Sequence, residues 1–250
     1  FLRPLSFSND HEIVRILRPS FSYPDYLELK EQSRTLSEAI AVSRQGDMLN
    51  RKGRVELVGL EVVSSNYFQV LGIQPHVGRF FSPEFLPSVH EPTVVLSYSL
   101  WQRCYQRDPQ ICGKTIWLTN ESYTVIGVTG KNFSGVERLS PVDIWCPAEV
   151  RGDTVKSASF SLMGRLAPGI SVEAALAEVD MIVDGLGINR NVKVVSESDV
   201  AERNAPLVSM VMSVVALVLL VACTNVSALL LARYESRQRE IAIRRALGSS

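Results

Sequence analysis

The residues of this sequence best suited to chemistry are its three histidines and four cysteines. The histidines, His11, His76 and His90, are scattered, and none has a partner at a spacing typical of metal ligands. The sequence holds no G-x-S-x-G nucleophile motif, no H-E-x-x-H zinc motif, no C-x-x-C pair and no Walker A phosphate loop. We therefore expect no enzyme activity, no metal and no cofactor in this chain.

Two of the cysteines, Cys104 and Cys112, lie close in sequence across the predicted end of a helix. An oxidising compartment would permit a disulfide bond between them, although spacing alone does not fix the required geometry. The alternative is that each is a small buried hydrophobic residue, which is the common state of cysteine. Cys146 and Cys223 are expected only to pack.

Composition excludes two broad classes of protein. The 250 residues include 26 basic and 26 acidic side chains, whereas a general nucleic-acid binder needs a basic excess. An acidic disordered chain is also excluded, because 46% of the residues are hydrophobic and only 21% are charged. The length suffices for one large domain or two small ones.

The apolar residues are concentrated near the C-terminus. Residues 207–232 read LVSMVMSVVALVLLVACTNVSALLLA, without one charge. A bilayer core of about 30 Å is crossed by roughly 20 helical residues, so this segment is predicted to be a transmembrane helix. The alternative, a buried helix of a soluble core, rarely runs this long without a charge. A signal peptide would be shorter and N-terminal.

The charges beside this segment predict its orientation. The following 18 residues, 233–250, contain five arginines and two glutamates, and the arginines begin at the membrane edge with Arg233 and Arg237. Because Lys and Arg favour the cytoplasmic side, residues 233–250 are predicted to be cytoplasmic and residues 1–206 extracytoplasmic. The alternative is that the tail is simply a solvated helix.

Small and hydroxyl-bearing side chains fall on nearly one face of the predicted span. Such residues let helices approach closely in lipid, so this face is expected to pack against other membrane helices or a second subunit. Asn225 is the one strongly polar side chain of the span, and interhelical hydrogen bonding is its simplest role. The predicted packing residues are Ser209, Ser213, Ala216, Thr224, Asn225 and Ser227.

The first 206 residues mix short extended and helical patterns. Hairpins among them predict an α+β domain, a mixed sheet with helices in two subdomains, rather than a doubly wound sheet. A capping-box pattern at residues 35–38 predicts a helical turn over residues 39–42. The other expected elements are a helix opening at Tyr23-Pro24, strands at residues 55–63, 93–96, 159–166 and 191–196, a helix capped by Ser97, a hairpin of residues 115–118 and 123–128, and a helix from Ser171 to about Leu186.

Several short motifs, taken together and in order, resemble the MacB-like periplasmic core domain. Each motif is weak alone, but the ordered set followed by a membrane span is specific. They are residues 22–26 (SYPDY), 65–75 (SNYFQVLGIQP), 78–81 (GRFF), 95–101 (VLSYSLW), 113–116 (GKTI), 123–128 (YTVIGV) and 143–147 (DIWCP). The C-terminal residues 239–249 (REIAIRRALGS) resemble the start of the FtsX-like permease domain.

The resemblance implies a permease subunit of an ABC transporter in the bacterial cytoplasmic membrane. Its first helix would lie upstream of Phe1 and further helices downstream of Ser250. The implied partners are an ABC ATPase that binds ATP and Mg²⁺, a second permease subunit or pseudo-repeat, membrane lipid, and a periplasmic adaptor with an outer-membrane channel. By this resemblance the tail couples to the ATPase through Arg239, Glu240, Ile241, Ile243, Arg244, Arg245 and Gly248. The alternative is an interfacial helix whose arginines bind anionic lipid.

Three functions remain open at this point. The first is export or extraction of a substrate from the periplasmic side, driven by ATP hydrolysis in the partner and transmitted to the outer domain. The second is an FtsX-like signalling permease that regulates periplasmic cell-wall enzymes without transport. The third is a sensor domain anchored by a single span.

Overall fold

The computed structural model describes residues 13–51, 53–85, 92–119, 121–136, 141–151, 155, 158–186, 193–196, 209–210, 212–227, 230 and 233. The chain forms two compact units, Phe1–Ser198 and Asp199–Ser250, which are described separately. The first unit contains the sheet and the helices that cover it, and the second contains the apolar segment.

The helices of the first unit begin where short polar residues cap them. Ser22 and Asp25 form a reciprocal capping box at the start of α1 (Tyr23–Gln32), with Pro24 in the first turn. Ser97 caps α3 (Tyr98–Tyr105), and Ser171 caps α5 (Val172–Gly185). These three predicted helix starts are confirmed. The unit also contains the short helix α2 (Tyr67–Val70) and the 3₁₀ turn η2 (Ala148–Val150).

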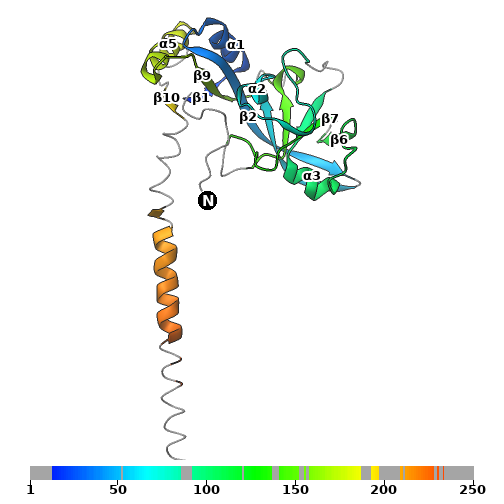
Figure 1. Cartoon of the computed structure of the whole chain (residues 1–250), viewed down its shortest axis with the longest axis vertical. Helices are drawn as coiled ribbons and strands as arrows, with labels where there is room; N and C mark the ends of the chain where they lie inside the picture. The colour runs from blue at the N-terminus through cyan, green and yellow to red at the C-terminus, as the bar shows by residue number, and fades with distance from the viewer. Residues whose placement is uncertain are drawn as a thin grey trace, which may run out of the picture. The chain divides into compact units, whose positions relative to one another are not determined.

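Among the described residues, ten strands form one mixed sheet (Figure 1). The strands are β1 (Ile13–Phe21), β2 (Leu36–Arg51), β3 (Arg54–Val63), β4 (Pro75–Gly78), β5 (Thr93–Leu96), β6 (Thr115–Leu118), β7 (Glu121–Thr129), β8 (Ile144–Pro147), β9 (Phe160–Leu166) and β10 (Lys193–Ser196). Their order is β10-β1-β9-β2-β3-β8-β5-β7-β4, and β6 pairs with both β2 and β7. The mixed α+β class is therefore confirmed, as are the predicted strands and the β6–β7 hairpin.

Because β6 bridges β2 and β7, six strands close into a barrel in the order β2-β3-β8-β5-β7-β6. The pairs β3–β8 and β5–β7 are parallel, and the other pairs of the ring are antiparallel. Closure leaves no free edge around this ring. The first half of β2 pairs instead with β9, outside the barrel. There β9 pairs with β1, and β1 pairs with β10.

Alternate residues of the barrel strands fill its interior. They include Leu49, Val58, Leu60, Val94, Leu96, Ile116, Leu118, Tyr123, Val125, Ile144 and Cys146, all buried. The same core continues to α1 and α5, which lie side by side at the end of the unit that holds β9 (Figure 1). A second core packs Tyr67 and Phe68 of α2 against Trp145, which presents its ring on the opposite face of β8.

The predicted helical turn over residues 39–42 is wrong, because these residues belong to β2. Thr35 does not cap a helix: its backbone amide donates to Glu178 of α5 at 2.8 Å, and its hydroxyl also donates to this carboxylate. Residues 39–42 are buried on both faces of the sheet. A strand buried on both sides is a continuous apolar run, which local pattern does not distinguish from a helix.

The prediction of two subdomains in residues 1–206 stays a prediction. Residues 1–198 form one compact unit in which a single strand, β2, is 16 residues long and pairs with β9 at one end and with β3 and β6 at the other. A strand shared in this way joins both ends of the sheet without a linker.

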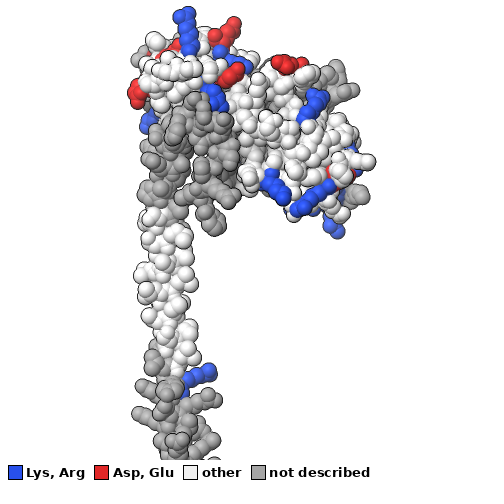
Figure 2. Space-filling view, in the orientation of Figure 1, with Lys and Arg blue, Asp and Glu red and all other residues white. Residues whose placement is uncertain are grey.

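In the second unit, described residues 209–210, 212–227, 230 and 233 are helical. Residues 212–227 carry no charge and form the white helical stretch in Figure 2. Within the part of the chain that the structure describes, no helix meets the length and hydropathy needed to cross a bilayer.

Candidate functional site

The outward side of the barrel strands β6, β2 and β3 carries an exposed surface without charge. Strand register places Trp117, Asn50 and Val55 in one cross-strand row, and Met48 and Leu57 in the next. The four apolar side chains are exposed: Trp117 to 54%, Val55 to 62%, Met48 to 47% and Leu57 to 69%. We call these five residues, with Gly46 and Gly59, the uncharged face.

Alternation along the strands produces this surface. The residues next to the exposed ones, Leu49, Val58 and Leu118, point into the barrel and are at most 2% exposed. In a strand buried on one side, the outward positions are normally polar. Here they are apolar or uncharged, which is typical of a surface that contacts another molecule.

A hollow of about 460 Å³ lies beside the exposed leucine of this face. Its floor is the cross-strand pair Gly46–Gly59, and its walls include Leu57, Arg44 and Pro141. A side chain at Gly59 would place its Cβ 3.0 Å from the carbonyl oxygen of Pro141, so this position accepts only glycine without movement. The two glycines leave bare backbone that a flat ring or an aliphatic chain could cover.

The side chains of this surface are suited to contact with another molecule. In the described ranges, no group of three or more His, Cys, Asp or Glu side chains is arranged to hold a metal. Met, Leu, Val and Trp side chains offer apolar area, while Asn50 and the neighbouring hydroxyls can donate and accept hydrogen bonds. The uncharged face is therefore a candidate interaction surface.

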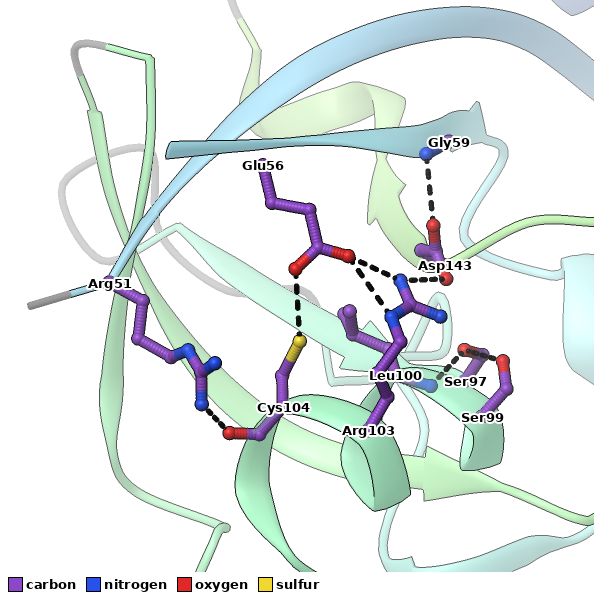
Figure 3. A network of polar contacts seen from close by, with 9 residues as sticks. All are labelled: Arg51, Glu56, Gly59, Ser97, Ser99, Leu100, Arg103, Cys104 and Asp143. Carbon is purple, nitrogen blue, oxygen red and sulfur yellow. Dashed lines mark hydrogen bonds and ion pairs between the residues drawn. The ribbon is translucent and has the colours of Figure 1, made fainter. Parts of the chain in front are cut away.

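A network of polar contacts fixes α3 against β3 (Figure 3). Arg103 donates to Glu56 of β3 at 3.0 Å and pairs with Asp143 at 3.4 Å. Asp143 in turn accepts the backbone amide of Gly59 at 3.2 Å. Hydrogen bonds from Cys104 and Arg103 hold the pKa of Glu56 below its ordinary value.

The two cysteines of the candidate disulfide, Cys104 and Cys112, each have a hydrogen-bond acceptor of their own. Cys104 donates its thiol to Glu56 at 3.3 Å, and Cys112 donates to the carbonyl of Ile126 at 3.5 Å; both thiols are free. Burial, followed by the contact with Glu56, raises the pKa of Cys104. Both causes favour the protonated thiol over the thiolate, which is the reactive form of cysteine.

A carboxylate from α5 binds the junction between α1 and β2. Glu178 accepts from the hydroxyl of Ser33 at 2.9 Å, the amide of Arg34 at 3.0 Å and the amide of Thr35 at 2.8 Å, with the Thr35 hydroxyl as a fourth donor. Burial alone would raise the pKa of Glu178, but these donors lower it below the ordinary value. The contact ties α5 to the rest of the first unit.

The predicted packing residues of the apolar segment lie on a helix in the second unit. Ser209, Ser213, Ala216, Thr224, Asn225 and Ser227 are all helical and exposed. The hydroxyl of Ser213 donates to the carbonyl of Ser209 at 2.9 Å, and that of Thr224 donates to the carbonyl of Val221 at 2.8 Å. These hydroxyls are thus satisfied within their own helix, as expected for an apolar medium. Their packing against other helices stays a prediction.

Arg233 is helical and exposed, whereas the remaining predicted residues of the tail lie outside the described residues. These are Arg237, Arg239, Glu240, Ile241, Ile243, Arg244, Arg245 and Gly248. Orientation in the membrane and coupling to an ATPase therefore stay predictions.

Sequence reasoning did not find the uncharged face or the role of Glu178. Buried Leu49 lies between exposed Met48 and Asn50, and this segment pairs with Val55 to Gly59. Such alternation with a period of two is a sequence signal that could have predicted a hairpin with one exposed face. Nothing local marks Glu178, since its partners are more than 140 residues earlier in the chain.

The sequence and fold were compared with known proteins. A family model described as the MacB-like periplasmic core domain matches residues 4–182. No curated protein sequence matches the chain. The fold is similar to the periplasmic region of MacB from Actinobacillus actinomycetemcomitans, with a TM-score of 0.63 and 13% identity over 77% of this chain and 92% of that one.

Two further solved structures share the fold. The extracellular domain of the noncanonic ABC-type transporter YknZ from Gram-positive bacteria has a TM-score of 0.59 and 14% identity, covering 73% of this chain and 99% of that one. A domain of a protein classed as a permease from Porphyromonas gingivalis has a TM-score of 0.58 and 14% identity, covering 76% and 93%. At these identities the likeness shows the fold alone.

Proposed function

The chain belongs to the MacB-like periplasmic core domain family, and from this premise we infer that it is part of a permease subunit of an ABC transporter. The observation that carries the proposal is the family match over residues 4–182 followed by the uncharged residues 207–232. Hydrolysis of ATP by a separate ATPase, which binds ATP and Mg²⁺, would move the membrane helices. The first unit would receive that motion and use it to export or extract a substrate from the periplasmic side.

The membrane arrangement is part of the proposal. Residues 207–232 would cross the cytoplasmic membrane, with Arg233 and Arg237 at its inner surface. The helical state and the exposed apolar side chains of residues 212–227 support this arrangement. A cytoplasmic reporter fused after Arg245 should then be active and a periplasmic one inactive, and the reverse result would refute the orientation.

Coupling to the ATPase would run through the tail, from Arg239 to Gly248. In a continuous helix Glu235–Arg239 and Glu240–Arg244 are pairs four residues apart in the favourable orientation. Exchanging Arg244 for Glu should therefore reduce ATP-driven activity of the assembled complex, whereas a tail that only touches lipid would leave it unchanged.

The first unit is built to move as one body. Glu178 ties α5 to the start of β2, and the Glu56–Arg103–Asp143 network ties α3 to β3 (Figure 3). Since β2 spans both ends of the sheet, displacement at one end would be passed to the other. The uncharged face would then meet its partner or substrate as a fixed surface.

The experiment that tests this role uses the full-length permease with its ATPase in cells. Leu57→Asp places a charge in the uncharged face, and Met181→Asp on α5 is the matched control, because both side chains are 69% exposed. We expect Leu57→Asp to abolish ATP-dependent export while Met181→Asp leaves it intact, with both proteins equally abundant. Equal export by both variants would show that export does not require the uncharged face.

The same cells distinguish transport from signalling. An ATPase-dead strain that loses export of a substrate supports transport by this complex. Intact export together with misregulated cell-wall hydrolysis would instead support the signalling alternative, in which the moving unit controls a periplasmic enzyme.

A further inference from the structure

The side chain of Tyr98, at the start of α3, has two cations beside its ring. The guanidinium carbon of Arg107 lies 5.6 Å from the ring centre, and the ammonium nitrogen of Lys131 lies 5.3 Å from it. Tyr98 itself is 8% exposed, whereas both cations are exposed. Two segments distant in sequence, after α3 and after β7, therefore deliver positive charge to one aromatic side chain.

Two neighbouring rings hold Tyr98 in place. His76 of β4 contacts the Tyr98 ring edge-on with centroids 5.2 Å apart, and Trp101 does so at 5.6 Å. The indole nitrogen of Trp101 donates to the carbonyl of Asp108 at 2.9 Å, which fixes the loop that carries Arg107. We call Tyr98, Arg107, Lys131 and His76 the basic cluster.

Arg107 reaches this position through an unfavourable backbone. Gln106 and Arg107 follow one another in the left-handed region, with φ of 53° and 57°. Residues with a Cβ seldom adopt this conformation twice in succession, and glycine would relieve the strain. The loop is held by amides of both residues, which donate to the carbonyl of Trp101. Strain of this kind is often retained where a side chain must be aimed.

The two cations of the basic cluster differ from nearby cations of the first unit, because no described carboxylate pairs with them. Arg103 pairs with Glu56, and Lys114 pairs with Asp108. Among the residues that the structure describes, no carboxylate contacts Arg107 or Lys131, and the Tyr98 hydroxyl has no hydrogen-bond partner. Two like charges at one ring repel each other, weakly because both are exposed to water, and an anion placed between them would turn that repulsion into attraction.

We propose that the basic cluster binds a phosphate-type oxyanion. Arg107 supplies a planar fork of donors and Lys131 a mobile point charge, and both groups are suited to bind the oxygens of a phosphate. The exposed position of both cations leaves the anion free to arrive as a soluble phosphate or as a lipid headgroup. This inference concerns the first unit alone and does not depend on the transport proposal.

The first test measures pyrophosphate binding to the chain in a neutral detergent by calorimetry. Arg107→Gln and Lys131→Gln should each weaken binding about tenfold, as expected for loss of one charge-assisted contact. Lys30→Gln on α1 removes the same charge elsewhere and should leave affinity unchanged. Equal weakening by all three variants, or no binding to the native chain at low salt, would overturn the proposal.

A second test separates binding from folding. Arg107→Gly removes both the cation and the strain, so it should lose pyrophosphate binding while its melting temperature without anion stays equal or rises. Gln106→Gly relieves strain next to it but keeps the cation, so it should bind as the native chain does. Retention of affinity by Arg107→Gly would show that the guanidinium is not a ligand group.

The source of the anion is identified by repeating the titration with soluble dihexanoyl phosphatidic acid. Tighter binding of this lipid than of pyrophosphate, with the same dependence on Arg107 and Lys131, identifies a lipid headgroup as the ligand. Tighter binding of pyrophosphate identifies a free phosphate compound. Lipid binding that ignores both substitutions would come from apolar surface and would count against the basic cluster.

Discussion

Removing the carboxylate of Glu178 should loosen α5 from the rest of the first unit. The carboxylate accepts four donors from Ser33, Arg34 and Thr35, at 2.8–3.0 Å for the three whose lengths are ordinary. A hydrogen bond to a charged group contributes about 1.5–3 kcal/mol, but these donors are only partly buried and water can replace some of them. We therefore expect Glu178→Ala to lower the free energy of unfolding by about 2–4 kcal/mol.

The corresponding change in melting temperature is about 5–12 °C, since 1 kcal/mol shifts a domain of this size by roughly 2–4 °C. Near-ultraviolet circular dichroism of the chain in mild detergent would record the transition. Asp180→Asn, on an exposed position of the same helix, is the matched control and should shift the transition by less than about 1 °C.

The pH dependence of this contact has a definite sign. Because the pKa of Glu178 is lowered in the folded state, its contribution is present above the pKa of the unfolded chain and is lost as the pH falls through the folded value. The stability difference between the native chain and Glu178→Gln should thus be constant near pH 7, begin to shrink near the ordinary glutamate pKa of about 4.3, and disappear once the pH lies below the folded value. A difference that did not shrink at all as the pH fell below the ordinary value would refute the assignment to the charged carboxylate.

Two further perturbations follow from the packing. Gly127→Ala should lower the melting temperature by several degrees, because the added Cβ would lie 2.2 Å from the carbonyl oxygen of Arg79. Gly130→Ala is the control and should change the melting temperature little, since no atom lies within 4 Å of the Cβ it would add. Equal melting temperatures of the two variants would contradict the close approach at Gly127. Glu56→Gln should let the raised pKa of Cys104 fall toward its ordinary value. The thiol of the folded variant should therefore react faster with a thiol reagent at pH 8 than the thiol of the folded native chain. An unchanged rate would mean that burial alone protects the thiol.

Elements with strong local signals were predicted from sequence. The start of α1 was predicted from Pro24 in its first turn, and the starts of α3 and α5 from their caps Ser97 and Ser171. These signals act within one turn and need no distant partner. The hairpin of β6 and β7 followed for the same reason, since a short turn joins two apolar runs.

Errors arose where a distant contact decided the local state. Thr35 has the sequence of a helix cap, yet its amide and hydroxyl bind Glu178, 143 residues later in the chain. Residues 39–42 then join a strand whose two faces are covered by the two apolar cores, one of which includes side chains of α1 and the other side chains of α2. A run of four apolar residues shows neither the helical nor the strand periodicity, so it does not distinguish a helical turn from a strand.

The sequence by itself determined three helix starts, several of the strands, the balance of charge, the apolar segment at residues 207–232 and the family resemblance, because each depends on residues close in the chain. Only the tertiary structure decided that β6 closes a barrel, that Met48, Leu57 and Trp117 share one exposed face, and that Arg107 and Lys131 meet at Tyr98. Such pairings are selected by burial of the whole core, to which residues far apart contribute together. No local pattern encodes that choice, so it appears only when the chain is folded.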